Sequence, residues 1–132
     1  GILMGEHIGP NQFQITSITV QSRRGSIFSF QRTLQDILTP IRQFFQATEH
    51  DYQRFNYLGE WHSHPSFTLK PSIIDCDTMW NIVDDPEVGA NFAVLLIVHL
   101  TTNYELQGSI TIFLPHKQKF NGTLRYEGQN TI

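Results

Sequence analysis

The apolar side chains at the start of the chain have the spacing of strands and then of a helix. Residues 1–5 form a short apolar run bounded by glycine, and residues 12–20 alternate apolar and polar side chains with one change of phase. Both segments predict strands, the second with a bulge where the phase changes. The next apolar residues have the spacing of an amphipathic helix packed on a sheet. They are Leu34, Ile37, Leu38, Ile41, Phe44 and Phe45. Pro40 either kinks this helix or begins a new one after Thr39.

The middle of the chain predicts a strand, a loop and a second helix. Residues 57–62 have the pattern of a strand, and Pro65 marks its end because proline lacks the N–H of the strand ladder. Residues 65–71 are expected to form a loop. The following helix is predicted over residues 72–83, where Asp-Asp-Pro stops it. Its expected apolar face consists of Ile73, Cys76, Trp80 and Val83.

The last third of the chain predicts a group of strands. Residues 92–100 read as a buried strand, and residues 101–103 as a hairpin turn. A half-buried strand is expected next, from the apolar alternation at Tyr104, Leu106, Gly108, Ile110, Ile112 and Leu114. A last strand is predicted over residues 123–126. No repeat or linker interrupts the sequence, so we expect residues 1–132 to form a single domain.

Composition narrows the class of protein. The 132 residues are 39% hydrophobic and 16% charged, which is typical of a globular chain. A net charge of -3 without a basic stripe argues against a nucleic-acid partner. The longest apolar run, residues 92–98, is too short to cross a bilayer, so no membrane partner is expected.

Cysteine use and the first residue add two further expectations. The single cysteine, Cys76, excludes an internal disulfide and fits a reducing compartment, which predicts a cytoplasmic protein. The chain begins at Gly1 inside a strand-like run and without an initiator methionine. We therefore expect it to lack its extreme N-terminus.

Two histidines and an aspartate have spacings that suit one metal ion. Side chains two apart on a strand share a face, so Glu60, His62 and His64 should project to the same side. Asp75 follows eleven residues after His64, which lets a loop return and place it in the first turn of the next helix. Catalytic zinc typically has three protein ligands and one open position, so these residues predict a hydrolytic Zn²⁺ site with metal ligands His62, His64 and Asp75.

Ser72 allows two interpretations. With Asp75 three residues later, it has the pattern of a capping box at the start of a helix. Beside the two histidines, its hydroxyl is also a candidate to stabilise an oxyanion, and the two roles are compatible. The other candidates have simpler explanations: Cys76 as a small core residue, His99 as a core or rim histidine, Asp77 as a competing ligand outside the pattern, Trp61 as a core anchor, and His7, His50 and His116 as solvated loop residues.

This pattern closely resembles the JAMM, or MPN+, metalloprotease family. The family motif is a glutamate, then His-Ser/Thr-His-Pro and Ser-x-x-Asp, with seven residues between the second histidine and the serine. The same spacing is present here, in His62-Ser63-His64-Pro65 and Ser72-Ile73-Ile74-Asp75. Gly59 and the run over residues 1–5 also look like family landmarks. The resemblance implies an α/β, cytidine-deaminase-like MPN/JAB domain with a mixed, largely antiparallel β-sheet flanked by helices.

The resemblance also implies an activity. JAMM enzymes are zinc-dependent isopeptidases, and this chain looks most like prokaryotic, deubiquitinase-like members. The implied partners are conjugates of ubiquitin or a ubiquitin-like protein, and enzymes resembling ubiquitin-activating and ubiquitin-conjugating enzymes. Ser72 would stabilise the tetrahedral oxyanion. Two alternatives stay open: processing of a ubiquitin-fold sulfur carrier, and a metal-free scaffold.

The general base is the one element of the family pattern that the sequence does not contain. In the family, the catalytic glutamate lies just before the strand that corresponds to residues 1–5, and therefore upstream of Gly1. Glu6 does not match that position and is expected to be a solvated turn residue. Glu60 is expected to bond the second ring nitrogen of a ligand histidine, or else to act as a substitute base.

Overall fold

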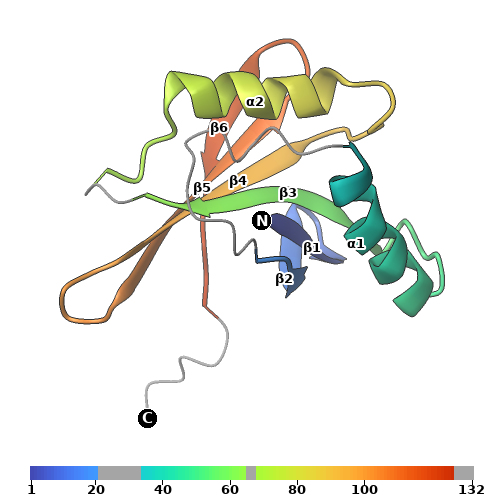
Figure 1. The fold of residues 1–132 in the computed structure, drawn as a ribbon, viewed down its shortest axis with the longest axis horizontal. Helices are drawn as coiled ribbons and strands as arrows, with labels where there is room; N and C mark the ends of the chain where they lie inside the picture. Colours follow the sequence, from blue (N-terminus) through green and yellow to red (C-terminus); the bar gives the residue numbers. More distant parts are fainter. Residues whose placement is uncertain (21–33, 65–67, 127–132) are drawn as a thin grey trace. The chain divides into compact units, whose positions relative to one another are not determined.

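The computed structural model describes residues 1–20, 34–64 and 68–126 of the chain (Figure 1). These residues contain two helices and six strands, so the predicted α/β class is confirmed. The finer assignment to the MPN/JAB fold stays a prediction, as does the single domain. The structure divides into two compact units, Gly1–Trp61 and His62–Ile132, which are described in turn. Pro65 and the side chains of Leu34 and Ile37 lie outside the described residues.

The first unit is built around a three-stranded antiparallel arrangement. Strand β1, Ile2–Gly9, lies between β2, Gln12–Ile18, and the first part of β3, Phe55–Ser63. Its core includes Ile2, Leu3, Met4 and Leu58, all of which are buried. Helix α1, Leu34–Ala47, is a single helix with Pro40 inside it, which decides between the two interpretations of that proline.

The predicted bulge in the second strand is present. Met4 lies opposite Ser17 and Gly5 lies opposite Ile15, so Thr16 has no partner in the register. The extra residue shifts by one the alternation of side chains between the two faces of the strand, as the phase change in the sequence predicts.

Strand β1 extends beyond its predicted end at Gly5. A Cβ on Gly5 would lie 2.0 Å from the carbonyl oxygen of Gln14, so this glycine allows a close approach to β2 and does not mark a turn. Glu6 and His7 therefore belong to β1, and their assignment to a turn and a loop was wrong. The Glu6 carboxylate accepts a hydrogen bond from Arg54 Nε at 2.9 Å, and His7 stacks on Phe13.

The second unit contains the end of β3, helix α2 and three antiparallel strands. Helix α2 spans Ile73–Asp84, and the strands are β4, Ala93–Leu100, β5, Leu106–Leu114, and β6, Gln118–Gly122. In Figure 1, α2 lies across β4 and β5. The core between these elements consists of Cys76, Met79, Val83, Ala93, Leu95, Ile97 and Phe113. This packing fixes the position of α2 on the strands.

The buried face of α2 differs from the predicted one in its first turn. Ile73 is 82% exposed, and the buried residues of the helix are Asp75, Cys76, Met79 and Val83. Asp75, Met79 and Val83 are spaced four residues apart, so they lie along the same side of the helix, and this side faces the core. Asp75 is therefore the buried residue of the first turn, where the apolar pattern predicted Ile73.

The final strands also differ from their predictions. On β5 the most buried side chains are Thr111 and Phe113, on the face opposite to the predicted alternation. Tyr104 lies outside the strand and is 86% exposed. The last strand is β6 and not residues 123–126, because the chain reverses over residues 115–117 with positive φ at His116 and Lys117. Such turns normally contain Gly, Asn or Asp, so the sequence carried no signal for this one.

Candidate metal centre

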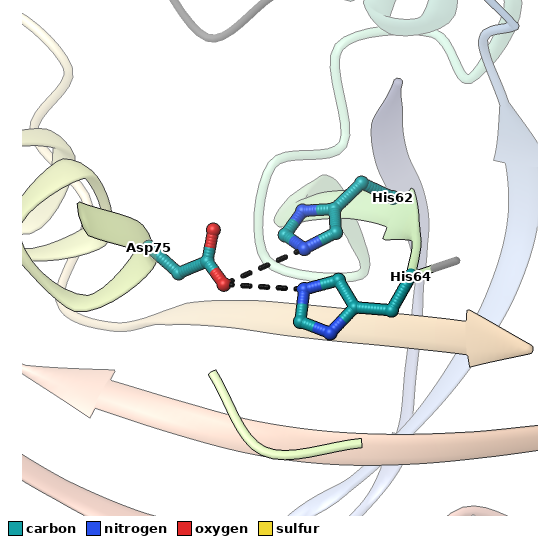
Figure 2. Close-up of side chains that lie close together, drawn as sticks. All are labelled: His62, His64 and Asp75. Carbon is teal, nitrogen blue, oxygen red and sulfur yellow. Dashed lines mark ion pairs between the residues drawn. The ribbon is translucent and has the colours of Figure 1, made fainter. Parts of the chain in front are cut away.

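The two histidines of the motif lie where β3 ends. His62 is in the strand, and His64 is the first residue after it. Their rings stack with centroids 4.7 Å apart and an interplanar angle of 25°. Figure 2 shows both rings pointing toward Asp75, as the alternation of side chains on a strand predicts.

Asp75 reaches the histidines from the first turn of α2. Its Oδ2 atom lies 3.6 Å from His62 Nε2 and 3.4 Å from His64 Nε2 (Figure 2). One possible ligand atom from each of the three residues lies within 4.8 Å of the other two. The structure thus brings together the three residues that the sequence motif predicts as metal ligands.

The capping box at the start of α2 is also present. Ser72 is the N-cap, its Oγ accepts a hydrogen bond from the Asp75 N–H at 3.1 Å, and its own N–H donates to Asp75 Oδ2 at 2.8 Å. These reciprocal bonds hold the aspartate side chain in one orientation. The same bonds that begin the helix therefore aim the carboxylate at the histidines.

The charge of Asp75 is set by two opposing effects. Burial of the carboxyl raises its pKa, but hydrogen bonds from His62 and from the Ser72 backbone and hydroxyl, with the charge of His62, lower the pKa to about 2. Asp75 is therefore a carboxylate at neutral pH. A buried carboxylate beside two imidazoles is a favourable site for a cation.

The hydrogen bond made by Nδ1 of His64 determines the tautomer of this residue. Nδ1 lies 3.1 Å from the carbonyl oxygen of Thr68, which can only accept, so Nδ1 carries the proton in this bond. In the neutral ring, the Nε2 lone pair then points toward Asp75. Metal-binding histidines typically donate their other N–H to a carbonyl or carboxylate in this way.

The donor set fits a divalent metal ion. Two ligands of a tetrahedral zinc, each at about 2.0–2.1 Å, are separated by roughly 3.4 Å. The nitrogen–oxygen distances of 3.4 and 3.6 Å agree with this separation. Imidazole nitrogen and carboxylate oxygen are ligands that zinc accepts, so His62, His64 and Asp75 can hold a metal ion.

Several other candidates lie apart from this cluster. Cys76 is in the core under α2, and Asp77 is exposed on the other side of that helix. Trp61 donates from Nε1 to the Thr19 carbonyl at 2.9 Å in the first unit, where Glu60 is only 3% exposed. His50 and His116 are exposed, as predicted.

One contact of the site was not found from the sequence. His99 Nδ1, on β4, lies 3.2 Å from the carbonyl oxygen of His64, one of the candidate ligands. His99 was expected to be a core or rim histidine, because no spacing in the sequence relates it to the motif. Only the packing of the end of β3 beside β4 makes the contact visible.

No helix in the described part of the chain has the length and apolar character needed to cross a membrane. Comparison of the sequence with models of known protein families and with curated proteins gave no match.

Proposed function

We propose that this chain is a zinc-dependent isopeptidase of the JAMM type, which cleaves the amide bond between the C-terminus of ubiquitin or a ubiquitin-like protein and a lysine. One observation carries the proposal. Donor atoms of His62, His64 and Asp75 converge, and Asp75 Oδ2 lies at the ligand–ligand distance of a tetrahedral site from both Nε2 atoms. This convergence supports the metal site, and the resemblance of the motif to the JAMM family supports the choice of reaction.

The metal would be held by Nε2 of His62, Nε2 of His64 and the carboxylate of Asp75. Zinc bound there would polarise the scissile carbonyl and make a water molecule acidic enough to react near neutral pH. The other residues of the site would orient the metal ligands. The Thr68 carbonyl keeps the proton on Nδ1 of His64, and the Ser72 N–H holds Oδ2 of Asp75.

Ser72 is proposed to act on the substrate. Its Oγ accepts from the Asp75 N–H, but a hydroxyl has two lone pairs and a proton of its own to donate. The residue is exposed at the start of α2. Without substrate, the hydroxyl hydrogen-bonds the Asp75 carboxylate. With substrate bound, we assign its proton to the oxyanion that develops on the scissile carbonyl, while the Ser72 N–H continues to hold Asp75 Oδ2.

Proton transfer from water to the leaving amine needs a general base. The JAMM resemblance assigns it to a glutamate just before β1. Glu60 is the competing candidate, and its near-complete burial in the first unit favours a structural role. We therefore assign Glu60 no part in the proton transfer.

The test combines metal analysis with cleavage of a defined substrate. The purified protein should contain one zinc per chain and release ubiquitin, or a ubiquitin-like protein, from an isopeptide conjugate. His64→Ala should lose both the metal and the activity, whereas His7→Ala, a strand histidine of the first unit, should retain both. Because the general base is expected upstream of Gly1, cleavage is measured on a chain that includes the native preceding residues.

The alternatives give different results in the same assay. A scaffold would purify without stoichiometric zinc. A processing peptidase would bind zinc and release the C-terminal extension of a sulfur carrier, but would leave the lysine isopeptide bond intact. Zinc retained by His64→Ala would contradict the ligand assignment itself.

A further inference from the structure

His64 lies one residue past the end of β3, yet three contacts hold it. Its backbone N–H donates to the Val98 carbonyl at 3.0 Å. Its ring Nδ1 bonds the Thr68 carbonyl at 3.1 Å, and its own carbonyl oxygen lies 3.2 Å from His99 Nδ1. The backbone of this metal ligand is therefore fixed on both its N–H and its carbonyl side.

The contact from His99 has a defined direction. A carbonyl oxygen can only accept, so His99 Nδ1 carries the proton and donates it to His64. His99 is itself anchored, because it lies within β4 opposite Gln107 of β5 and is partly buried. A side chain on a paired strand thus supports a residue that no longer belongs to a strand.

We infer that His99 is a positioning residue for the metal centre: its Nδ1–H holds the His64 carbonyl and thereby orients the His64 ring toward Asp75. The inference rests on the proposed metal site but not on the proposed reaction. The direction of the Cα–Cβ bond of His64 depends on the two peptide groups that flank it. One of these groups is held by Val98 and the other by His99.

The loss of this bond should weaken metal binding without removing a ligand. Replacing the hydrogen-bond partners of metal ligands typically lowers metal affinity about 10–100-fold. His99 does not belong to the group of potential ligands formed by His62, His64 and Asp75. A change in metal affinity would therefore come through His64.

The experiment compares His99→Asn with His99→Leu. The two side chains have the same branching and nearly the same size, but only asparagine keeps an N–H donor near the position of Nδ1. Zinc affinity is measured by competition with a chelating indicator, and site geometry by the visible absorption of the Co²⁺-loaded protein. His7→Leu in the first unit is the control.

We expect His99→Leu to bind zinc about 10–100-fold more weakly and to alter the Co²⁺ spectrum, and His99→Asn to recover most of the affinity. Equal affinities of His99→Leu and the wild type would overturn the inference, and so would an asparagine variant as weak as the leucine variant. Failure of the wild type to bind zinc would instead contradict the metal site.

A measurement on the wild type keeps the test valid if His99→Leu does not fold. Nitrogen-15 NMR of the imidazole rings reports which nitrogen carries the proton. The inference requires the proton of neutral His99 to be on Nδ1. A His99 ring with its proton on Nε2 alone would contradict it.

Discussion

At the scale of single residues, Asp75 shows how one side chain can both cap a helix and belong to a candidate metal site. Its Oδ2 accepts the Ser72 N–H at 2.8 Å and faces the Nε2 atoms of both histidines. The capping box was the simpler explanation of Ser72 and Asp75, and it is present. The capping box does not compete with the proposed ligand role, because its bonds hold the side chain in the rotamer whose Oδ2 faces both histidines.

The two roles of Ser72 can be separated by replacing it with glycine. Glycine at an N-cap costs only a few tenths of a kcal/mol compared with serine, whereas alanine costs about 1 kcal/mol. Ser72→Gly should therefore stay folded and retain zinc. If the hydroxyl stabilises the oxyanion, turnover should fall roughly 10²–10³-fold, with thermal unfolding and zinc content as the accompanying measurements.

Ser72→Thr is the matched control, because threonine keeps both the hydroxyl and the capping ability. Its turnover should stay well above that of the glycine variant. A folded, zinc-loaded Ser72→Gly protein with wild-type turnover would limit Ser72 to its capping role.

At the scale of elements, β1 owes its length to a close approach between backbones. Gly5 lies within the strand, and the Gln14 carbonyl of β2 occupies the space where a side chain would begin. At Gly9, at the end of the same strand, the atoms nearest to an added Cβ belong to the flexible Gln12 side chain, the closest at 3.2 Å. The two glycines therefore tolerate substitution differently.

Gly5→Ala should destabilise the protein by about 1–3 kcal/mol, because the added methyl group forces the two strands apart. Gly9→Ala should change the free energy of unfolding by less than about 0.5 kcal/mol, as for an ordinary surface site. Urea denaturation followed by circular dichroism measures both values. Equal stability of the two variants would show that β1 and β2 do not approach each other as closely as described.

The second helix shows the same dependence on its neighbours. Met79 and Val83 pack against Leu95 and Phe113, and this packing places the first turn of α2 beside the end of β3 within the second unit. The apolar pattern located the helix to within one residue at each end. It did not reveal that Asp75 would point inward while Ile73 is exposed.

At the scale of the whole molecule, the three proposed ligands all belong to the second unit. His62 and His64 come from its first residues, and Asp75 comes from α2. A metal ion bound by them would join two segments of that unit. Zinc should therefore stabilise the folded state of this part of the chain.

Adding Zn²⁺ to the metal-free protein at about 100 times its dissociation constant should raise the free energy of unfolding by about 2.7 kcal/mol. A higher midpoint of thermal unfolding, reversed by a chelator, is the expected observation. Asp75→Asn is the control, because its amide oxygen can still accept the Ser72 N–H but carries no charge for the metal. A shift of equal size in this variant would exclude Asp75 as a ligand.

Local physical rules explain why much of this protein could be predicted. Alternation along a strand puts His62 and His64 on one side whatever surrounds them, and the capping box between Ser72 and Asp75 involves only neighbouring residues. The bulge at Thr16 was visible as a change of apolar phase. The turn before β6 was missed because His116 and Lys117 adopt positive φ without the usual turn residues.

The amino-acid sequence was sufficient to predict the α/β class, the positions of most elements and the identity of the candidate ligands, because these depend on periodicity and on contacts between near neighbours. The burial of Asp75 against the two histidines, the place of Gly5 inside a strand and the contact of His99 with His64 became known only from the folded chain. These features depend on segments far apart in the chain. Their packing has no local signature, since it is the closeness of two backbones or side chains that creates each interaction.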